Sequence, residues 1–413
     1  MTEEKKLVPK RRLDSYSEAW VEKELNDLGT FGRTYSFSRS KEGRGIYHHI
    51  HYGDIHTKNL GVINNNSILP TIKEEGTFEL LKQGDIVIAD ASEDYKDLGK
   101  TTVIGETENR KIIAGLHTFK FTPNEFLYPI YYLYYSQSRI FKNFTYKTGT
   151  GISVFGISKD NLGKMRLYIP TYEEQKKIGE FFKVLDERIA NQERKIAKVK
   201  ALKSAYLTEM FPQEGETVPK RRFKDFNEEW SKRRLKELGE ILTGSTPPTN
   251  ILKYYSDSGV PWVTPTDIKE NITLVTAKHL SEEGQKVARL VPKNTILVTS
   301  IASIGKNTIL GTTGSFNQQI NGLIPNQSEN DPYFLYVAST LWSRILANKA
   351  ASGTMQIVNK TEFSNLITFI PSLKEQQKIG QFFKNLDNKI TTEEKKLEKL
   401  KKMKEAYLEE MFV

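Results

Sequence analysis

The chain has 413 residues, a formal net charge of +10 at neutral pH and no cysteine. At roughly 150 residues per domain, this length predicts two or three domains. The lack of cysteine excludes a disulfide scaffold, a cysteine-ligated zinc site and a thiol nucleophile. No apolar run reaches the roughly 18 residues that span a bilayer, and the charged N-terminus does not resemble a secretory signal. We therefore expect a cytoplasmic protein, and its basic balance favours a polyanionic partner.

Two pairs of anchor segments show that the sequence repeats itself. Residues 8–29 and 218–239 both begin VPKRR and are identical at 10 of 22 positions. Residues 169–211 and 370–412 both contain EQ followed by KIG and FF, and they are identical at 24 of 43 positions. Repeats of this kind indicate repeated structural units. The chain is thus predicted to consist of two halves, each with a divergent globular segment followed by a strongly similar tail.

Weaker similarities between these anchors follow the same order in both halves. Residues 98–105 (LGKTTVIG) match residues 304–311 (IGKNTILG), and the tyrosine-rich residues 128–139 match residues 333–344. The sequence offset between the halves changes along the chain, as small insertions and deletions in surface loops would cause. One duplicated fold is the simplest interpretation.

The globular segments are predicted to be β-rich. Short runs of Ile, Val, Leu and Thr follow Gly or Asn, a pattern typical of a turn leading into a buried strand. Strands are predicted at 84–88, 101–104, 294–298 and 308–310, and helices at 128–139 and 333–346. We expect an α+β domain with long loops in each half.

The tails are predicted to be long helices with an apolar heptad seam. About 38 residues at about 1.5 Å each would give a rod about 57 Å long. One seam position is polar in both copies, Gln192 and Glu393. The helices either pack into their own domains or pair with each other, and we favour pairing because each carries a matching seam. The seam residues are Ile178, Phe182, Leu185, Ile189, Ile196 and Val199 in the first tail, and Ile379, Phe383, Leu386, Ile390, Leu397 and Leu400 in the second.

Enzymatic motifs are incomplete or missing. Gly-Lys pairs at 99–100 and 305–306 suggest a phosphate loop, but the required earlier glycine is replaced by Asp94 and Ser300. A Gly-Lys turn between strands, with its lysine free to contact a phosphate, is the better interpretation. We find no cofactor fingerprint, no nucleophile elbow and no Asp/Asn-Pro-Pro-aromatic methyltransferase tetrapeptide. The sequence therefore predicts no catalytic residue in this chain.

Four of the six histidines, His48, His49, His51 and His56, lie close together in the first half. They are either a metal site or, as we favour, a polar strand edge that meets a ligand. The second half has Trp262 and Thr264 at the positions of His49 and His51, which excludes a metal chemistry common to both halves. We predict no metal.

Basic, amide, hydroxyl and aromatic side chains suited to phosphate and base contacts cluster in both globular segments. Residues 30–168 carry a net charge of +4 but residues 240–369 only +1, so charge alone does not identify the second segment as a DNA binder. The alternative for each side chain is an ordinary solvated loop. The candidates in the first segment are Arg33, Ser38, Arg39, Lys41, Arg44, Tyr47, His51, Lys100 and Lys147. Those in the second are Thr246, Lys253, Tyr254, Tyr255, Thr264, Lys269, Ser300, Ser303, Lys306, Asn317, Gln318 and Gln319.

Taken together, the anchors resemble the specificity (S) subunit of type I restriction-modification systems, over essentially the whole chain. The resemblance rests on VPKRRF followed by W and LGEI in 218–241, on Pro-Trp-Val with Asp-Ile in 261–268, and on the two tails. It implies two target recognition domains that each read one part of a bipartite DNA site. It further implies that the helices form an antiparallel coiled coil that sets the spacing. Two modification subunits would dock there for S-adenosylmethionine-dependent adenine methylation, and restriction subunits would add ATP- and Mg²⁺-dependent translocation and cleavage.

The first segment departs from this pattern, because His49 stands where Trp is expected and the Gly-Ser-Thr-Pro loop is altered at 33–40. Recognition segments in this family vary with the DNA sequence that they read. A coiled-coil scaffold and a self-sufficient DNA-modifying enzyme remain as alternative functions. The predicted organisation is a disordered N-terminus (1–7), recognition domain 1 (8–168), a central helix (169–211), a linker (212–217), recognition domain 2 (218–369) and a C-terminal helix (370–413).

Overall fold

The computed structural model describes residues 8–57, 61–213, 215–301, 303–351 and 357–413. The chain forms two compact units: unit 1 comprises residues 1–192 and 396–413, and unit 2 comprises residues 193–395. The predicted disordered N-terminus, residues 1–7, lies outside the described residues. Each unit combines one globular domain with one end of each long helix. The organisation predicted from the sequence had instead made each helix a separate segment.

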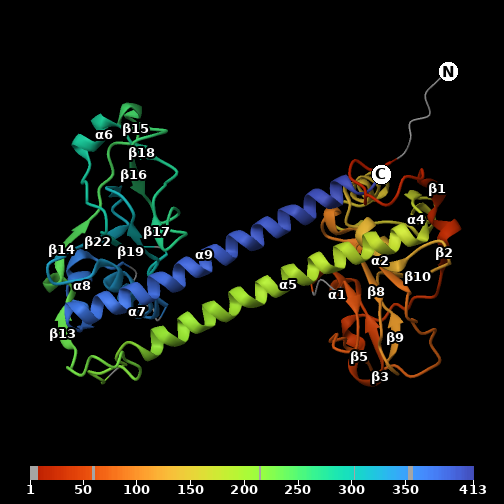
Figure 1. Cartoon of the computed structure of the whole chain (residues 1–413), viewed down its shortest axis with the longest axis horizontal. Helices are drawn as coiled ribbons and strands as arrows, with labels where there is room; N and C mark the ends of the chain where they lie inside the picture. Colours follow the sequence, from red (N-terminus) through yellow and green to blue (C-terminus); the bar gives the residue numbers. More distant parts are fainter. Residues whose placement is uncertain (1–7, 58–60, 214, 302, 352–356) are drawn as a thin grey trace. The chain divides into compact units, whose positions relative to one another are not determined.

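A five-stranded sheet forms the centre of unit 1 (Figure 1). Its strands follow the order β2 (Gly29–Phe31), β10 (Thr118–Pro123), β6 (Ile86–Ala89), β8 (Thr101–Ile104) and β4 (Val62–Ile63). All neighbours are antiparallel except β4 and β8. Every residue of β6 and β8 is buried, because both faces of the sheet are covered. This explains why neither predicted strand shows the alternation of polar and apolar residues that a half-exposed strand would have.

Unit 2 repeats this sheet with the same strand order. Its strands are β14 (Gly239–Thr243), β22 (Ile320–Pro325), β19 (Ile296–Thr299), β20 (Asn307–Leu310) and β17 (Ile272–Thr273). Only β17 and β20 are parallel. The duplicated α+β fold predicted from the anchors is therefore confirmed at the level of topology.

The predicted turns before the buried strands are confirmed and have a shared backbone conformation. Gly84 and Asn294 precede β6 and β19 with φ of 90° and 73°, in the left-handed region that glycine and asparagine tolerate best. Gly99 and Gly305, in the Gly-Lys turns before β8 and β20, also have positive φ. The same local sequence chemistry thus starts equivalent strands in both halves.

The outer sheets differ between the two units. In unit 1 the outer sheet has three strands, in the order β5 (Thr71–Ile72), β3 (Glu42–Ile50) and β9 (Lys111–Ala114). In unit 2 it has four, in the order β15 (Tyr255–Ser256), β18 (His279–Leu280), β16 (Val260–Val263) and β21 (Ser315–Phe316). The pairs β3–β9 and β16–β21 are both parallel and occupy equivalent places. A shared central sheet therefore supports two dissimilar outer parts.

The remaining elements cover the sheets or connect them. Two ribbons pair β1 (Val21–Glu24) with β12 (Arg166–Ile169) and β13 (Ser231–Arg234) with β23 (Ile367–Ile370), and β7 (Ala91–Ser92) pairs with β11 (Phe155–Gly156). The shorter helices are α1 (Tyr52–Thr57), α2 (Pro129–Tyr135), α3 (Arg139–Thr148), α4 (Lys159–Gly163), α6 (Glu282–Val287), α7 (Pro332–Ala351) and α8 (Lys360–Ser364). None of the helices in the described ranges combines the length and apolar character that a membrane span requires.

The register between α2 and α7 differs from the predicted one by two residues. Trp20 packs edge-on against Tyr131 in unit 1, and Trp230 packs edge-on against Phe334 in unit 2. Tyr131 therefore corresponds to Phe334, whereas the sequence match had aligned Tyr128 with Tyr333. The sequence match paired identical tyrosines, but the two halves retain the buried position that packs against the tryptophan, and the residue type at that position differs.

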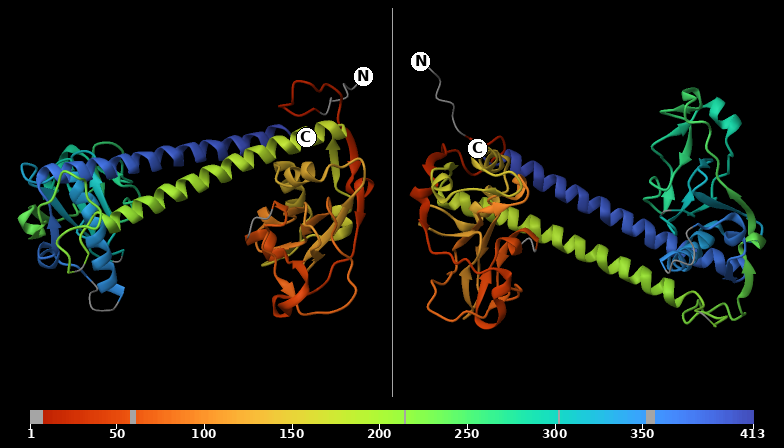
Figure 2. Two further views of the ribbon diagram at one scale, coloured as in Figure 1. Left: turned by 60° about the horizontal axis from the view of Figure 1, so that its bottom comes forward. Right: turned by 180° about the vertical axis from the view of Figure 1, so that it is seen from behind.

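The two predicted tail helices are present as α5 (Tyr172–Glu209) and α9 (Leu373–Glu410). Within each unit they run side by side in opposite directions (Figure 2): Phe181 packs against Tyr407 in unit 1, and Tyr206 against Phe382 in unit 2. All twelve predicted seam residues are buried or half-buried. The seam also packs on the domains, since Phe182 stacks on Tyr134 of α2. Both interpretations of the heptads thus apply.

The repeated VPKRR segments anchor each domain to the helix ends by equivalent ion pairs. Arg12 donates two hydrogen bonds to the buried Glu174 at 2.8 and 2.7 Å in unit 1. Arg222 does the same to the buried Glu375 at 2.7 and 2.8 Å in unit 2. The preceding arginine of each segment reaches the far end of the other helix, as in the 2.7 Å pair between Arg11 and Glu410. This explains why the two anchor sequences recur together.

Candidate nucleic-acid interface

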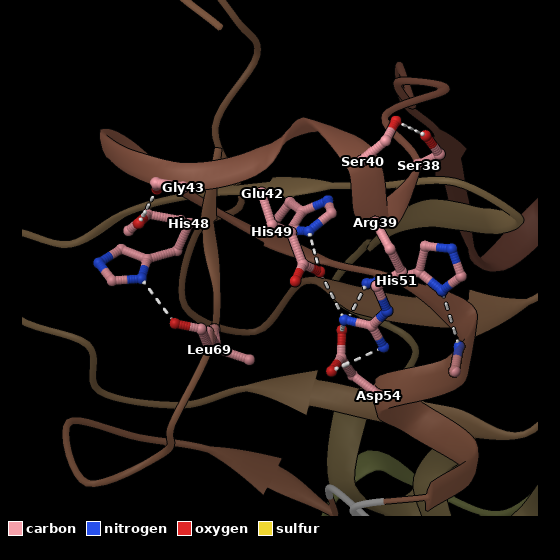
Figure 3. Close-up of polar contacts among 12 residues, drawn as sticks. Ser38, Arg39, Ser40, Glu42, Gly43, His48, His49, His51, Asp54 and Leu69 are labelled. Atoms are coloured by element: carbon pink, nitrogen blue, oxygen red, sulfur yellow. Dashed lines mark hydrogen bonds and ion pairs between the residues drawn. The ribbon is translucent and has the colours of Figure 1, made fainter. Parts of the chain in front are cut away.

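A polar cluster beside β3 gathers several of the predicted residues of the first domain (Figure 3). Arg39 donates to Glu42 Oε1 at 2.6 Å and to both carboxylate oxygens of Asp54 at 3.2 Å. Asp54 is fully buried at the start of α1 and also accepts the backbone N–H of His51. Although burial raises it, the pKa of Glu42 stays below its ordinary value because Arg39 and His49 hydrogen-bond to the carboxylate. Arg39 is thus held in a fixed orientation while about half of it remains exposed.

The four clustered histidines contact protein groups individually. His48 Nδ1 lies 3.2 Å from the carbonyl oxygen of Leu69, and His49 Nε2 lies 3.1 Å from Glu42 Oε1. His51 Nδ1 accepts the N–H of Gly53, and His56 Nε2 lies 2.9 Å from the carbonyl oxygen of Ala91. Within the described ranges, no group of three or more potential ligands is arranged to hold a metal ion. These imidazoles brace the backbone around β3 and α1.

We expect His51 to make the stability of the first domain depend on pH. Burial, together with the nearby Arg39, lowers the pKa of His51 to about 4. The unfolded chain therefore binds the extra proton more readily, so stability is complete above the ordinary pKa and falls as the pH drops toward 4. The loss attributable to His51 is about 2 kcal/mol at pH 5.

A His51→Asn variant separates this effect from other acid-sensitive groups, because asparagine keeps an acceptor for Gly53. Melting temperatures of both proteins should be compared at pH 7.5 and pH 5. The variant should lose less stability than the native chain. Equal losses would contradict a buried, uncharged His51.

The other basic and hydroxyl candidates of the first domain are partly or fully exposed. Arg33, Arg44 and Lys147 are exposed, and Lys41 forms a 2.7 Å ion pair with Glu74 while half of its side chain stays in solvent. Ser38 and Ser40 share a 2.8 Å hydrogen bond on the loop before β3. Long exposed cations are suited to phosphate contact.

Two predicted contacts of the first domain are already occupied by protein groups. The hydroxyl of Tyr47 donates to the carbonyl of Gly76 at 2.8 Å, and the side chain is 9% exposed. Lys100 was expected to be free for a phosphate, but its ammonium donates to the carbonyl of His56 at 3.2 Å and lies 3.8 Å from Asp97. The carbonyl of His56 is distant in sequence, so residue type and turn position do not reveal this partner, and the phosphate contact of Lys100 stays a prediction.

The second domain builds an equivalent turn from different residues. Asp267 accepts the backbone N–H of Thr264 at 2.8 Å, as Asp54 accepts that of His51 at 3.1 Å. The other carboxylate oxygen of Asp267 accepts the N–H of Ala277 at 2.9 Å. In the first domain, the corresponding donor to the aspartate is the guanidinium of Arg39. The predicted match between the two Asp-Ile pairs is therefore confirmed, and only the first domain presents an arginine there.

Five predicted residues of the second domain meet at three adjoining loops. The hydroxyl of Thr246 donates to Gln318, and Asn317 Nδ2 donates to Gln319 Oε1 at 2.9 Å. Ser300 Oγ donates to the carbonyl of Gln319 at 2.9 Å. Thr246 and Gln318 are exposed, whereas Ser300 and Asn317 are buried beneath them. The loops thus expose amide and hydroxyl groups, and the hydrogen bonds of the buried Ser300 and Asn317 hold these loops in place.

The other candidates of the second domain lie outside this group. Lys269 and Lys306 are exposed, and Lys253 lies 3.3 Å from Glu283. Tyr255 donates its hydroxyl to the carbonyl of Pro247 at 2.6 Å. The half-buried candidates Tyr254, Thr264 and Ser303 complete the set.

Sequence reasoning missed Arg289, which joins the Thr246 loop. Its N–H donates to Ser245 Oγ at 3.0 Å, its guanidinium bonds to the carbonyl of Thr243, and the residue is exposed. Trp262 Nε1 also donates to the carbonyl of Ser245, at 3.1 Å. Arg289 is more than 40 positions from this loop, and no local pattern marks it.

The chain belongs to the family described as the type I restriction modification DNA specificity domain, which it matches over residues 17–201 and 227–402. It is 29% identical over 181 residues to the type I restriction enzyme MjaIX specificity subunit of Methanocaldococcus jannaschii, covering 42% of each chain. It is 27% identical over 180 residues to the EcoR124I/EcoR124II specificity subunit of Escherichia coli, covering 41% of this chain and 44% of that one. The aligned region therefore spans less than half of either relative.

One solved structure is similar along almost the entire length. The S subunit of a type I restriction-modification system from M. genitalium aligns with a TM-score of 0.63 at 15% identity, covering 98% of this chain and 99% of that one. At this identity the similarity establishes the fold alone. The family predicted from the anchor sequences is confirmed.

Proposed function

We propose that this chain is a non-catalytic DNA-recognition subunit whose two domains each read one part of a bipartite site. The single observation that carries the proposal is the duplicated central sheet beneath dissimilar outer sheets and loops. A shared framework would place two reading surfaces equivalently, while the variable parts would give each its own sequence preference. Membership of the DNA specificity family supports the same conclusion.

The proposed reading surfaces follow the geometry of each domain. In the first, Arg39 and the exposed Arg33, Lys41 and Arg44 would contact phosphates and base edges. In the second, Thr246 and Gln318, together with the exposed Arg289 bonded to the same loop, would hydrogen-bond to bases with little help from net charge. Affinity would therefore depend on salt more strongly in the first domain.

The rest of the function would come from partner chains. We propose that two modification subunits dock on α5 and α9 and supply S-adenosylmethionine-dependent adenine methylation. Restriction subunits would add ATP- and Mg²⁺-dependent translocation and cleavage. The helix pair would set the spacing between the two parts of the site. Two quasi-equivalent halves give an approximate two-fold arrangement that matches two copies of one partner.

Exchanging one recognition domain tests this proposal. Replacing residues 240–369 by the corresponding segment of another specificity subunit should change one part of the methylated sequence and leave the other part unchanged. Methylation mapping of cells carrying the native or the chimeric chain with its modification subunit would measure this. A change in both parts, or in neither, would reject the modular proposal, and methyl transfer or cleavage by the purified chain alone would favour an enzyme.

A further inference from the structure

In unit 1, three elements meet at Asp186. This residue lies on α5 and accepts the phenol hydroxyl of Tyr134, on α2, at 3.0 Å. Its carboxylate also pairs with the ammonium of Lys404, on α9, at 2.7 Å. Lys404 in turn donates to Gln137, which follows α2, at 3.0 Å, and its ammonium lies 5.4 Å from the centre of the Tyr134 ring. The domain is thus connected to both helices through one set of side chains.

Unit 2 contains the same arrangement around Asp387. This residue lies on α9, accepts the hydroxyl of Tyr333, on α7, at 2.8 Å, and pairs with Lys203, on α5, at 2.5 Å. The side chain of Asp387 is 4% exposed and that of Lys203 is 17% exposed. Burial and the adjacent Asp387 raise the pKa of Tyr333, so the phenol remains a donor. This hydrogen bond to a charged group is of the stronger kind.

The two tyrosines occupy different positions of equivalent helices. The register is fixed by Gln175, whose side chain accepts the N–H of Tyr128, and by Gln376, which accepts that of Asp331. Counting from these residues, Tyr333 corresponds to Ile130, and Tyr134 lies one helical turn further along than that position. The aspartates and lysines, by contrast, are strictly equivalent in the repeat. Both halves therefore retain the same contact although they make it with non-equivalent side chains.

We infer that Tyr134–Asp186 and Tyr333–Asp387 are positioning contacts, which fix the orientation of each recognition domain on the helix pair and thereby select the spacing of the DNA site. The selection of the DNA spacing rests on the proposed function, whereas the orientation of each domain on the helices does not. The ion pair joins the two helices, and the phenol joins the domain to that ion pair. Loss of the hydroxyl alone should widen the range of domain orientations that the Arg222–Glu375 pair and the apolar contacts allow, without breaking the helix pair.

The first experiment measures orientation without DNA. Because the chain has no cysteine, Lys286→Cys on α6 and Lys389→Cys on α9 would place two spin labels at exposed sites of unit 2. Distances between the labels would be recorded for the full chain with and without Tyr333→Phe. The matched control is Ser339→Ala, which removes another hydroxyl of α7, one that accepts a 2.6 Å hydrogen bond from Asn307 Nδ2 within the domain.

We expect a narrow distance distribution for the native chain and for Ser339→Ala, and a broad one for Tyr333→Phe. In the complex with modification subunits, methylation of DNA substrates with spacers altered by one base pair would be compared. Tyr333→Phe should lower the preference for the native spacer about tenfold and leave both half-sites unchanged, since a hydrogen bond to a charged group is lost.

Two results would overturn the inference: an unchanged distribution and spacer preference in Tyr333→Phe, or equal broadening in Ser339→Ala. A native complex that methylates no bipartite site would reject the proposed function and the spacing part of the inference with it. The label distances would still decide the orientation part, because they involve no DNA.

Discussion

Replacing Arg12 by alanine is expected to lower the free energy of unfolding of unit 1 by about 3 kcal/mol. The guanidinium makes two hydrogen bonds to Glu174, and that carboxylate is fully buried. Without Arg12 the carboxylate would remain buried and uncompensated, which costs far more than the net value of the pair itself. The VPKRR segment would also lose its attachment to α5.

The repeat supplies matched comparisons for this measurement. Arg222→Ala should cost unit 2 a similar amount, because Glu375 is equally buried. Arg11→Ala removes an exposed ion pair with Glu410 and should cost much less than Arg12→Ala, because water already solvates both charges. Urea unfolding followed by tryptophan fluorescence is a suitable probe, since Trp20 lies in unit 1 and the other three tryptophans lie in unit 2. Similar losses for Arg11→Ala and Arg12→Ala would show that burial of the carboxylate does not determine the effect.

Lengthening both helices by seven residues is expected to lengthen the DNA spacer by about three base pairs. The insertions would lie between Asp186 and Ile196 in α5 and between Asp387 and Leu397 in α9. Seven residues add about 10 Å of helix and preserve the heptad seam. One base pair occupies about 3.4 Å of duplex, so the predicted change is close to a whole number of base pairs.

Methylation mapping of the lengthened chain with its modification subunit would measure the spacer directly. Both half-sites should keep their sequences, because no residue of either domain changes. A seven-residue insertion in α5 alone is the control: it leaves the partner seam unmatched and should abolish methylation. A lengthened chain that still uses the native spacer would mean that the helices do not set the distance.

The long helices were predictable because their signal is local and periodic. Apolar residues at steps of three and four, such as Phe182 and Phe383, fix both the helix and its buried stripe without reference to any distant residue. The repeat made the organisation of the whole chain predictable as well, since two copies of VPKRR and two similar tails define equivalent halves. Strands β6 and β8 were predictable for a related reason: each is a short run rich in β-branched residues that follows a turn.

The binding candidates were less predictable, because side-chain availability depends on residues distant in sequence. Lys100 lies in a well-predicted turn, yet the carbonyl of His56 occupies its ammonium. Arg289 carries no local signal and joins the Thr246 loop only through the folded backbone. Net charge had a similar limitation, since it reports how many cations a segment contains and not which ones are paired.

The sequence alone indicated the family, the duplication and the two long helices, and it favoured their pairing, because these properties are expressed in periodicity and in self-similarity along the chain. The tertiary structure decided how the domains attach to the helices. Glu174 and Glu375 are charged residues in a charged helix, and only folding buries them beneath an arginine of the repeated segment. Tyr134 and Tyr333 show the same principle: they are not aligned in the repeat, yet packing brings each phenol to an equivalent aspartate. A contact of that kind belongs to three elements at once, so no single stretch of sequence encodes it.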